Sequence, residues 1–391
     1  MKRNLIAICM IVLFILSFST NQLNLVESNI ERDYWPTDGW ENSSFEEVAM
    51  NKERIVEMFK YIDKNNFAID SVLIVKDGDL VVEEYLTISS ETLHPIYSVT
   101  KSFTSTLIGI AIEEGYIESV DQKIIDFIGH VDVPNIDSKE NITIAHLLTM
   151  TSGIVWNEDI SYHDPENTFR QLYDSSNWVE FVLNQAMEDE PGNTWKYNSG
   201  GSHLLSAIIE NATGISTLGY ADSHIFSTLG FSNYYWEEDP QNICFGGSGL
   251  QLLPRDMAKL GYLFLNNGTW DETQIVPEEW VSQASEGKIY LSERTDYGYQ
   301  WWIFPLLDAY LALGWAGQII CVIPQHDIVA VFTSSLDESE FPFRELLADY
   351  IIKASEEGYI EPIPITMSSI ILSLSISTAV IMFKKKQARL K

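Results

Sequence analysis

The chain has 391 residues, of which 46% are hydrophobic and 12% aromatic, so it can bury a large core and is not a disordered or low-complexity protein. It carries 56 acidic residues against 24 lysines and arginines, a formal net charge of −32 at pH 7. A surface this acidic repels nucleic acid and anionic lipid headgroups, and we therefore expect no nucleic-acid partner.

The first residues predict an export signal. Lys2 and Arg3 precede an apolar run from Leu5 to Phe18, which is typical of secretory segments. No Ala-x-Ala cleavage site follows, so residues 1–21 are either a signal peptide or an N-terminal anchor. Residues 22–45 hold turn residues without periodicity, and we interpret them as a leader.

Residues 46–357 predict one α+β domain. Apolar spacing predicts a helix over 46–62 and a hairpin over 71–85 that turns at Asp77-Gly78. From 101 to about 258 the pattern is helical with long loops, including helices at 177–187 and 202–211. Strands are expected at 299–304, 310–313, 319–323 and 328–333, followed by a helix at 343–354. The early and late strands should form one antiparallel sheet flanked by helices, with the helical middle as an inserted all-α lobe.

The end of the chain predicts a membrane anchor. Ile363 to Phe383 contains no charged residue, and Lys384, Lys385 and Lys386 follow it directly. That length spans a bilayer, and the basic cluster should stay on the cytoplasmic side. We expect a linker at 358–362, a single transmembrane helix at 363–383 in contact with membrane lipid, and a cytoplasmic tail at 384–391. The domain before it would face outward.

The two cysteines of the domain, Cys244 and Cys321, lie in apolar strand-like runs. A disulfide is permitted outside the cell, but buried free thiols are also common in such runs, so their pairing stays open. Asn-x-Ser/Thr sequons begin at Asn42, Asn141, Asn211 and Asn267, which suits an exported protein.

Motifs of several rival chemistries are missing from the sequence. It contains no His-Glu-x-x-His, no phosphate-binding glycine loop and no Gly-x-Ser-x-Gly elbow, and its seven histidines lack metal-ligand spacing. We therefore expect neither a metal nor a cofactor.

A Ser-x-x-Lys stands where a helical run begins. Ser98 would lie at the helix N-terminus with Lys101 one turn later, so both side chains project from one face. A desolvated lysine can take the serine proton, and the helix terminus favours the negative charge of an attacked carbonyl. Alone the motif is weak, because about one is expected by chance in such a chain and a capping serine with a solvated lysine is the plainer interpretation.

Further motifs follow in order along the chain: Leu147-Leu148-Thr149-Met150-Thr151-Ser152-Gly153-Ile154, then Tyr197, then Gly246-Gly247-Ser248-Gly249-Leu250 with Pro254-Arg255-Asp256, and finally Gly314-Trp315-Ala316-Gly317-Gln318. Their content and order resemble the serine β-lactamase-related family, which includes class C β-lactamases, penicillin-binding-protein-like hydrolases, esterases and 6-aminohexanoate-dimer hydrolases. The resemblance covers about residues 51–354. It implies a β-lactamase/transpeptidase-like fold with its active site between the two lobes.

The resemblance also implies catalytic roles. Ser98 would be the nucleophile, while Lys101 and Tyr197 would transfer protons, with the lysine cation expected to lower the pKa of the tyrosine. The family's Tyr-x-Asn motif is altered here, because Ser199 stands where the asparagine is usual. Whether Asn198 compensates stays open, and substrate orientation rather than nucleophile activation is in question.

The third motif is the turn at Trp315-Ala316-Gly317. By resemblance, the amides of Ser98 and Gln318 would form the oxyanion hole, where each donor lowers the barrier by about 3 kcal/mol. Trp315 and Ala316 replace the cation and hydroxyl that bind a substrate carboxylate, which disfavours β-lactams and favours an apolar or aromatic substrate portion. The expected substrate-binding residues are Tyr97, Trp156, Ser199, Trp315, Ala316 and Gly317.

The sequence therefore predicts a membrane-anchored extracellular serine hydrolase that cleaves a small-molecule or peptide-like ester or amide through an acyl-Ser98 intermediate. A β-lactamase or D-amino-acid peptidase of the same fold is the alternative. A non-catalytic sensor or scaffold stays open because of Ser199 and Trp315, although the intact Ser98, Lys101 and Tyr197 argue against it. The sequence does not predict an oligomeric state.

Overall fold

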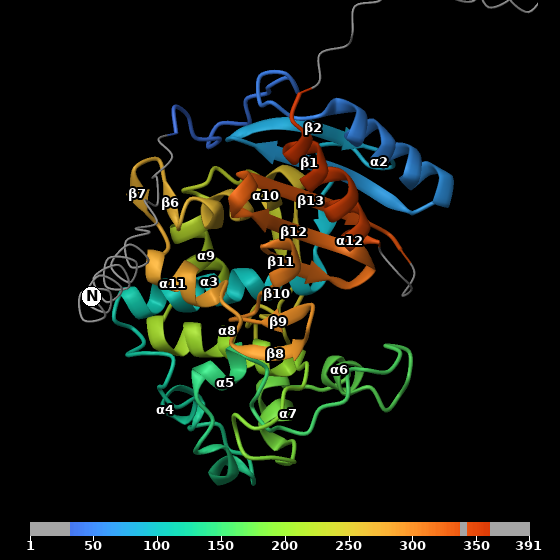
Figure 1. Cartoon of the computed structure of the whole chain (residues 1–391). Coiled ribbons are helices and arrows are strands. Elements are labelled where there is room, and N and C mark those ends of the chain that lie inside the picture. Colours follow the sequence, from blue (N-terminus) through green and yellow to red (C-terminus); the bar gives the residue numbers. More distant parts are fainter. Residues whose placement is uncertain (1–31, 337–341, 360–391) are drawn as a thin grey trace, which may run out of the picture. The chain divides into compact units, whose positions relative to one another are not determined.

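The structure, a computed structural model, describes residues 32–336 and 342–359. Those from Pro36 onward form a compact unit. Its main feature is an eight-stranded sheet in the order β2-β1-β13-β12-β11-β10-β9-β8, with every neighbouring pair antiparallel (Figure 1). The strands are β1 Ile69–Lys76, β2 Asp79–Tyr85, β8 Ile289–Ser292, β9 Thr295–Tyr297, β10 Trp302–Phe304, β11 Ala309–Gly314, β12 Gln318–Ile323 and β13 Ile328–Ser334.

The N-terminal hairpin joins the last strand of the sheet. Asp77 and Gly78 both adopt positive φ, at 56° and 99°, which an Asp-Gly pair tolerates well and which lets β2 fold back on β1. On its other side β1 pairs with β13, with Val72 opposite Phe332. The predicted antiparallel sheet, made from both ends of the domain, is confirmed.

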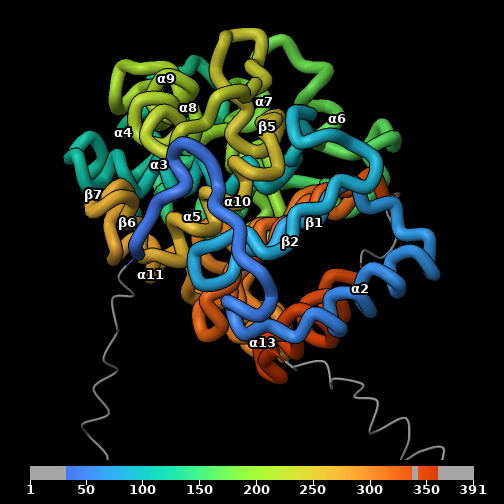
Figure 2. The backbone as a smooth tube through the Cα atoms, turned by 90° about the horizontal axis from the view of Figure 1, so that it is seen from above, coloured from blue at the N-terminus to red at the C-terminus, as the bar shows by residue number. Residues whose placement is uncertain are grey.

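Helices cover both faces of this sheet. On one face, α2 (Lys52–Asn65) and the C-terminal helical segment (343–357) bury an aliphatic core against β1, β11, β12 and β13. Figure 2 shows α2 and α13 (Lys353–Glu357) side by side. On the opposite face lies α10 (Pro254–Leu265), where a Cβ on Gly261 would stand 2.5 Å from Val329 Cγ1. The missing side chain therefore lets this helix lie close against the strands.

The chain between β2 and β8 supplies the predicted helical lobe. Its centre is the pair α3 and α8, which contact each other and are buried over most of their length. The helices here are α3 Thr100–Glu113, α4 Ile125–Ile128, α5 Ile144–Leu148, α6 Thr168–Tyr173, α7 Trp178–Asn184, α8 Ser199–Thr213, α9 Thr217–Ala221 and α11 Glu278–Ala284. Short strands β3 (His94–Pro95), β5 (Leu250–Leu252) and β4 (Tyr234–Trp236) form a second sheet, and β6 (Thr269–Trp270) pairs with β7 (Thr273–Gln274).

Several predicted boundaries differ from the structure. The helix expected at 46–62 begins only at Lys52, because the Asn51 side chain accepts the amide of Glu53 and caps it there. The strand expected at 299–304 begins at Trp302, and β8 and β9 were not predicted. The expected C-terminal helix contains a π-helical stretch, Leu346–Ile352. Cys244 and Cys321 are both buried and free.

Within the described ranges, none of the helices combines the length and apolar character needed to cross a bilayer. The expected N-terminal segment 1–21, the membrane helix 363–383 and the tail 384–391 lie outside the described residues.

Candidate active site

The candidate nucleophile lies where the chain turns from the small sheet into the helical lobe. Ser98 is the middle residue of a 3-10 turn, η1 (Tyr97–Val99), which leads directly into α3. Tyr97 has φ 47°, in the left-handed region that non-glycine residues seldom occupy. Such backbone strain is typical of functional turns, and here it directly precedes the serine.

Lys101, one turn later, is only 2% exposed and makes three hydrogen bonds. Its Nζ lies 3.0 Å from Ser98 Oγ, 2.9 Å from Ser199 Oγ and 2.7 Å from the carbonyl oxygen of Gly247. Three partners fill the tetrahedral valences of an ammonium group. The structure thus brings the Ser98–Lys101 turn together with Ser199, which lies about a hundred residues later in the chain.

A buried carboxylate that sequence reasoning missed stands behind this lysine. Glu158 is 8% exposed and accepts four hydrogen bonds. Its Oε2 accepts from the Ser199 amide (2.9 Å) and from Trp156 Nε1 (2.7 Å), and its Oε1 accepts from Ser199 Oγ (2.6 Å) and Tyr162 OH (3.3 Å). In a chain with 56 acidic residues the only sequence signal for it was its place just after the Thr-Ser-Gly turn.

This carboxylate fixes the direction of the hydrogen bonds. Because the Ser199 hydroxyl donates to Glu158, its oxygen accepts from Lys101, and the Gly247 carbonyl can only accept. A neutral Lys101 has two N–H donors, and these two acceptors engage both. In this neutral form the lone pair of the amine is left for the Ser98 hydroxyl, whereas the protonated amine donates to Ser98 Oγ.

The pKa values distinguish the two candidate proton carriers. Burial lowers the pKa of Lys101 to about 8, with the negative charge of Glu158 acting in the opposite direction. Burial raises the pKa of Tyr197 well above its usual value, and Glu158 raises it further, against a hydrogen bond with Ser98. The expectation that lysine lowers the tyrosine pKa is therefore wrong, because desolvation outweighs a cation that lies 4.7 Å from the ring centroid. Tyr197 is a neutral phenol.

The altered second motif has a clear structural outcome. The Asn198 side chain caps α8 by accepting the amide of Gly201 at 2.8 Å, and its Nδ2 has no hydrogen-bond partner among the described residues. Asn198 therefore does not replace the usual asparagine. Ser199 contacts the lysine instead, with Glu158 behind it.

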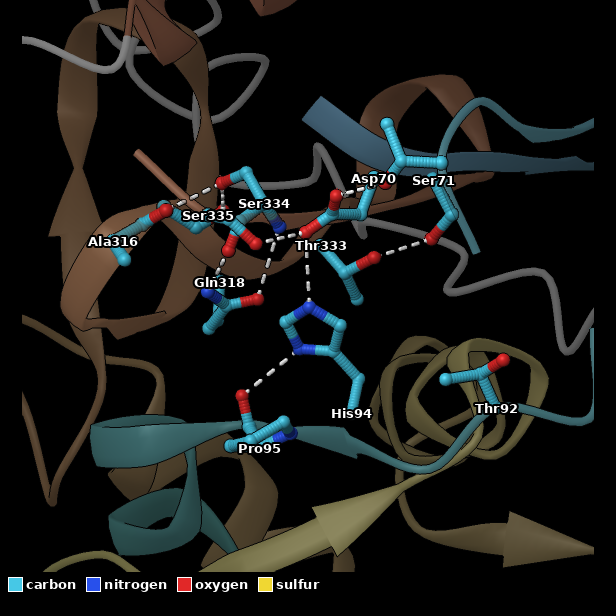
Figure 3. Close-up of polar contacts among 12 residues, drawn as sticks. Asp70, Ser71, Thr92, His94, Pro95, Ala316, Gln318, Thr333, Ser334 and Ser335 are labelled. Carbon is cyan, nitrogen blue, oxygen red and sulfur yellow. Dashed lines mark hydrogen bonds and ion pairs between the residues drawn. The ribbon is translucent and has the colours of Figure 1, made fainter. Parts of the chain in front are cut away.

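The third motif forms a strained turn before β12. Ala316 has φ 61° and Gly317 φ 89°, and the Ser334 hydroxyl donates to both of their carbonyls (Figure 3). The Gln318 side chain donates to Ser334 O at 2.6 Å and to Trp315 O at 3.2 Å. Ser334 on the neighbouring strand β13 and the Gln318 side chain thus hold this turn in place. The turn leads directly to the backbone amide of Gln318, which is predicted to stabilise the oxyanion.

The nucleophile turn and this strand are packed together. Gly314 lies against Ile96, since a Cβ there would stand 2.4 Å from the Ile96 carbonyl oxygen, and η1 contacts both β11 and β12. Close packing at Gly314 therefore brings the chain around Ser98 next to the start of β12, where Gln318 lies. Assignment of the Ser98 and Gln318 amides as oxyanion donors stays a prediction.

A polar network anchors the strand that leads to Ser98 (Figure 3). His94 Nε2 lies 3.1 Å from Asp70 Oδ2, and its Nδ1 lies 3.0 Å from the Pro95 carbonyl oxygen. Ser335 donates to the same Asp70 oxygen at 2.6 Å, and Thr87 also donates to Asp70. One buried carboxylate thereby ties β1, β3 and the chain just after β13 into one frame around the turn.

A cavity of about 310 Å³ opens beside Ser98. Of the predicted substrate-binding residues, Tyr97 and Trp315 line it, with their rings edge to face at 5.2 Å and Trp315 39% exposed. Ala316 and Gly317 form the adjoining turn. Ser199 is buried against Lys101 and Glu158, away from the cavity wall.

Trp156 does not meet the expectation of substrate contact. It is fully buried, donates to Glu158 and fills the space beside Gly200, where a Cβ would stand 2.5 Å from its Cη2. Its place after the Thr-Ser-Gly turn makes it a support for Glu158. Within the ranges that the structure describes, no group of three or more His, Cys, Asp or Glu side chains could hold a metal ion.

Fold and site together define a serine hydrolase built on two lobes. Residues 60–353 match the family described as Beta-lactamase, and the chain belongs to that family.

The chain is 23% identical to the 6-aminohexanoate-dimer hydrolase of Paenarthrobacter ureafaciens over 290 residues, which are 68% of this chain and 72% of that protein. It is 22% identical to Penicillin-binding protein 4* of Bacillus subtilis over 301 residues, 65% of this chain and 64% of that protein. A solved family VIII carboxylesterase shares the fold with a TM-score of 0.61 at 17% identity, covering 77% of this chain and 96% of that one. The resemblance read from the motifs is confirmed.

Proposed function

We propose that this hydrolase is an esterase or amidase that forms an acyl enzyme on Ser98. One observation carries the proposal: a buried lysine with a pKa of about 8 lies 3.0 Å from Ser98 Oγ, and its other two contacts are acceptors that leave its lone pair to the serine. A group that titrates near neutral pH is suited to general-base catalysis.

In the proposed reaction, neutral Lys101 takes the Ser98 proton as Oγ attacks the carbonyl carbon of the substrate. The amides of Ser98 and Gln318 stabilise the oxyanion. Tyr197 then protonates the leaving group and regains a proton from the Lys101 ammonium, for which a neutral phenol is the required form. Water attacks the acyl enzyme by the same route in reverse, which restores Ser98.

Two of the similar proteins are named as a 6-aminohexanoate-dimer hydrolase and a carboxylesterase, and the cavity favours substrates without a carboxylate. Its lining residues include no lysine or arginine, and Trp315 stands where a carboxylate-binding cation would be expected. A β-lactamase or D-amino-acid peptidase would need that contact, so it is the less favoured alternative. Turnover of nitrocefin faster than that of short-chain esters would reverse this preference.

The test is active-site labelling. The chain is treated with a fluorophosphonate, its intact mass is measured, and hydrolysis of p-nitrophenyl butanoate is followed in parallel. We expect one adduct and turnover on the wild type, neither on Ser98→Ala, and both on Ser285→Ala, which removes the serine of the other Ser-x-x-Lys. A folded wild-type chain that neither reacts nor turns over any ester or amide would favour the scaffold alternative.

We further propose that the hydrolase is anchored in the cell membrane with its catalytic domain outward. The proposal is supported by the uncharged run 363–383 and the lysines that follow it. The full chain should stay in the membrane fraction after alkaline extraction, while a chain ending at residue 361 and lacking residues 1–21 should be released. Release of both chains would contradict anchoring at the C-terminal segment.

A further inference from the structure

The cavity beside Ser98 has walls of an unusual composition. Five aromatic side chains line it: Tyr97, Tyr162, Phe169, Tyr173 and Trp315. Its acidic lining residues are Glu158 and Glu237. His163 also lines it, and neither lysine nor arginine is among the lining residues. A wall of this kind combines negative charge with the electron-rich faces of aromatic rings.

The two carboxylates differ in how they are engaged. Both oxygens of Glu158 accept hydrogen bonds from the protein. Among the described residues, the Glu237 carboxylate accepts a hydrogen bond only from the Tyr173 hydroxyl, 2.6 Å from Oε2, and it pairs with no lysine or arginine. Glu237 therefore keeps hydrogen-bonding capacity and an unbalanced negative charge at the cavity wall.

A serine hydroxyl in the same wall is also unused. Ser248 is 8% exposed and lines the cavity, and its hydroxyl has no hydrogen-bond partner among the described residues. The next residue, Gly249, has φ 84°, and a Cβ there would stand 2.8 Å from Glu237 Cβ. The glycine brings the Ser248 segment against Glu237, so the free hydroxyl and the free carboxylate oxygen belong to one part of the cavity.

We propose that this part of the cavity binds an organic ammonium group of the substrate, with Glu237 as its counter-ion and the aromatic side chains as its walls. An ammonium gains from both groups at once, through ion pairing and through cation–π contact, and an acidic chain also attracts cations over distance. An anionic group would meet two carboxylates and no lysine or arginine in the lining. The reactive substrates are then esters or amides whose acyl portion carries a cationic amine. Cleavage of such substrates rests on the proposed hydrolysis, but binding of the ammonium group does not.

Two esters of the same shape test the preference. The p-nitrophenyl ester of 4-(trimethylammonio)butanoate and that of 5,5-dimethylhexanoate differ in having nitrogen or carbon at the branched centre, and therefore in charge. On the wild-type chain we expect kcat/KM to be about tenfold higher for the cationic ester. Glu237→Gln should bring the two esters close to equality by lowering kcat/KM for the cationic ester about tenfold more than for the neutral one. Glu238→Gln, a change at the exposed neighbouring carboxylate, should preserve the preference and so controls for general charge.

Binding is measured separately on Ser98→Ala by titration calorimetry with hexyltrimethylammonium. Saturable binding that Glu237→Gln abolishes in this background is the expected result. If the wild type cleaves both esters equally and no binding is seen, the subsite is overturned while the hydrolase proposal stands. If neither ester is cleaved but binding depends on Glu237, the subsite stands and the proposed hydrolysis fails.

Discussion

At the scale of single residues, the protonation state of Lys101 controls the proposed chemistry. Burial lowers its pKa to about 8, and only the neutral amine can accept the Ser98 proton. For a neutral ester, kcat/KM should therefore rise with pH between about 6 and 9, with a midpoint near 8. The profile is measured at constant ionic strength. A rate that is flat over this interval would show that Lys101 is not the base.

Glu158 gives a second prediction, because its charge raises the pKa of Lys101. Glu158→Gln removes that charge, so the rising limb of the pH profile should move to lower pH. The amide nitrogen of the glutamine would also face hydrogen-bond donors such as Trp156 Nε1 or the Ser199 amide. We expect a loss of about ten- to hundredfold in kcat/KM at the optimum, corresponding to about 1.5–3 kcal/mol for a hydrogen bond to a charged group.

The matched control for that variant is Asp159→Asn, which removes the next carboxylate in the chain, an exposed one. Asp159→Asn should leave the rising limb of the pH profile and kcat/KM at the optimum unchanged. If Glu158→Gln lowered the rate without moving the limb, Glu158 would hold Ser199 in position without tuning the lysine.

The contrast between Lys101 and Glu158 shows what sequence can predict at this scale. Ser98 and Lys101 lie one turn apart, so helix geometry alone brings their side chains to one face. Glu158 reaches the lysine only through Ser199, forty-one positions away in the chain, and depends on tertiary packing. The rise in the pKa of Tyr197 is likewise a consequence of burial, which a motif does not encode.

At the scale of elements, the first turn of α8 gives a matched pair of glycines. A Cβ on Gly200 would stand 2.5 Å from Trp156 Cη2 and 2.7 Å from Val182 Cγ2, whereas a Cβ on Gly201 would meet its nearest side-chain atoms at 3.6 Å. Gly200→Ala must therefore displace the helix start that carries Ser199, and overpacking of this kind costs about 1–3 kcal/mol.

Gly201→Ala meets ordinary contacts, and alanine favours a helix by about 0.5–1 kcal/mol over glycine. We expect Gly200→Ala to lower both the melting temperature and kcat/KM, and Gly201→Ala to keep or raise the melting temperature. Circular dichroism and ester hydrolysis measure the two effects. Equal behaviour of the two variants would contradict the close packing of α8 on Trp156.

Elements were predictable where local chemistry fixes them. The β1–β2 hairpin followed from an Asp-Gly pair between two apolar runs, and its turn lies where expected. The start of α2 did not follow from periodicity, since apolar residues precede it and the cap at Asn51 decides the boundary. Strands β8 and β9 are short and exist through pairing with each other and with β10, a partner that sequence patterns do not specify.

At the scale of the whole molecule, the two ends of the domain complete each other. β1 pairs with β13, the Asn51 amide donates to the Ala354 carbonyl at 2.8 Å, and Arg54 contacts Glu357. The sequence order predicted the pairing of the early and late strands. A hairpin at the start and strands at the end, with helices between them, can bury their apolar faces together in one common sheet. The sequence could not indicate that the last helical segment also closes the core over α2.

That closure leads to a prediction about chain length. Leu346, Leu347, Ile351 and Ala354 are fully buried against α2 and the sheet. Burial of each large aliphatic side chain stabilises the fold by about 1.5–3 kcal/mol, so removing the segment takes away a large part of the 5–15 kcal/mol that is typical of a domain. A chain ending after residue 341 should lose cooperative thermal unfolding and bind a hydrophobic dye, whereas a chain ending after residue 359 should melt cooperatively. Similar melting of the two chains would show that the sheet and α2 are stable without the segment. The C-terminal helices would then serve only to connect the domain to the residues that follow.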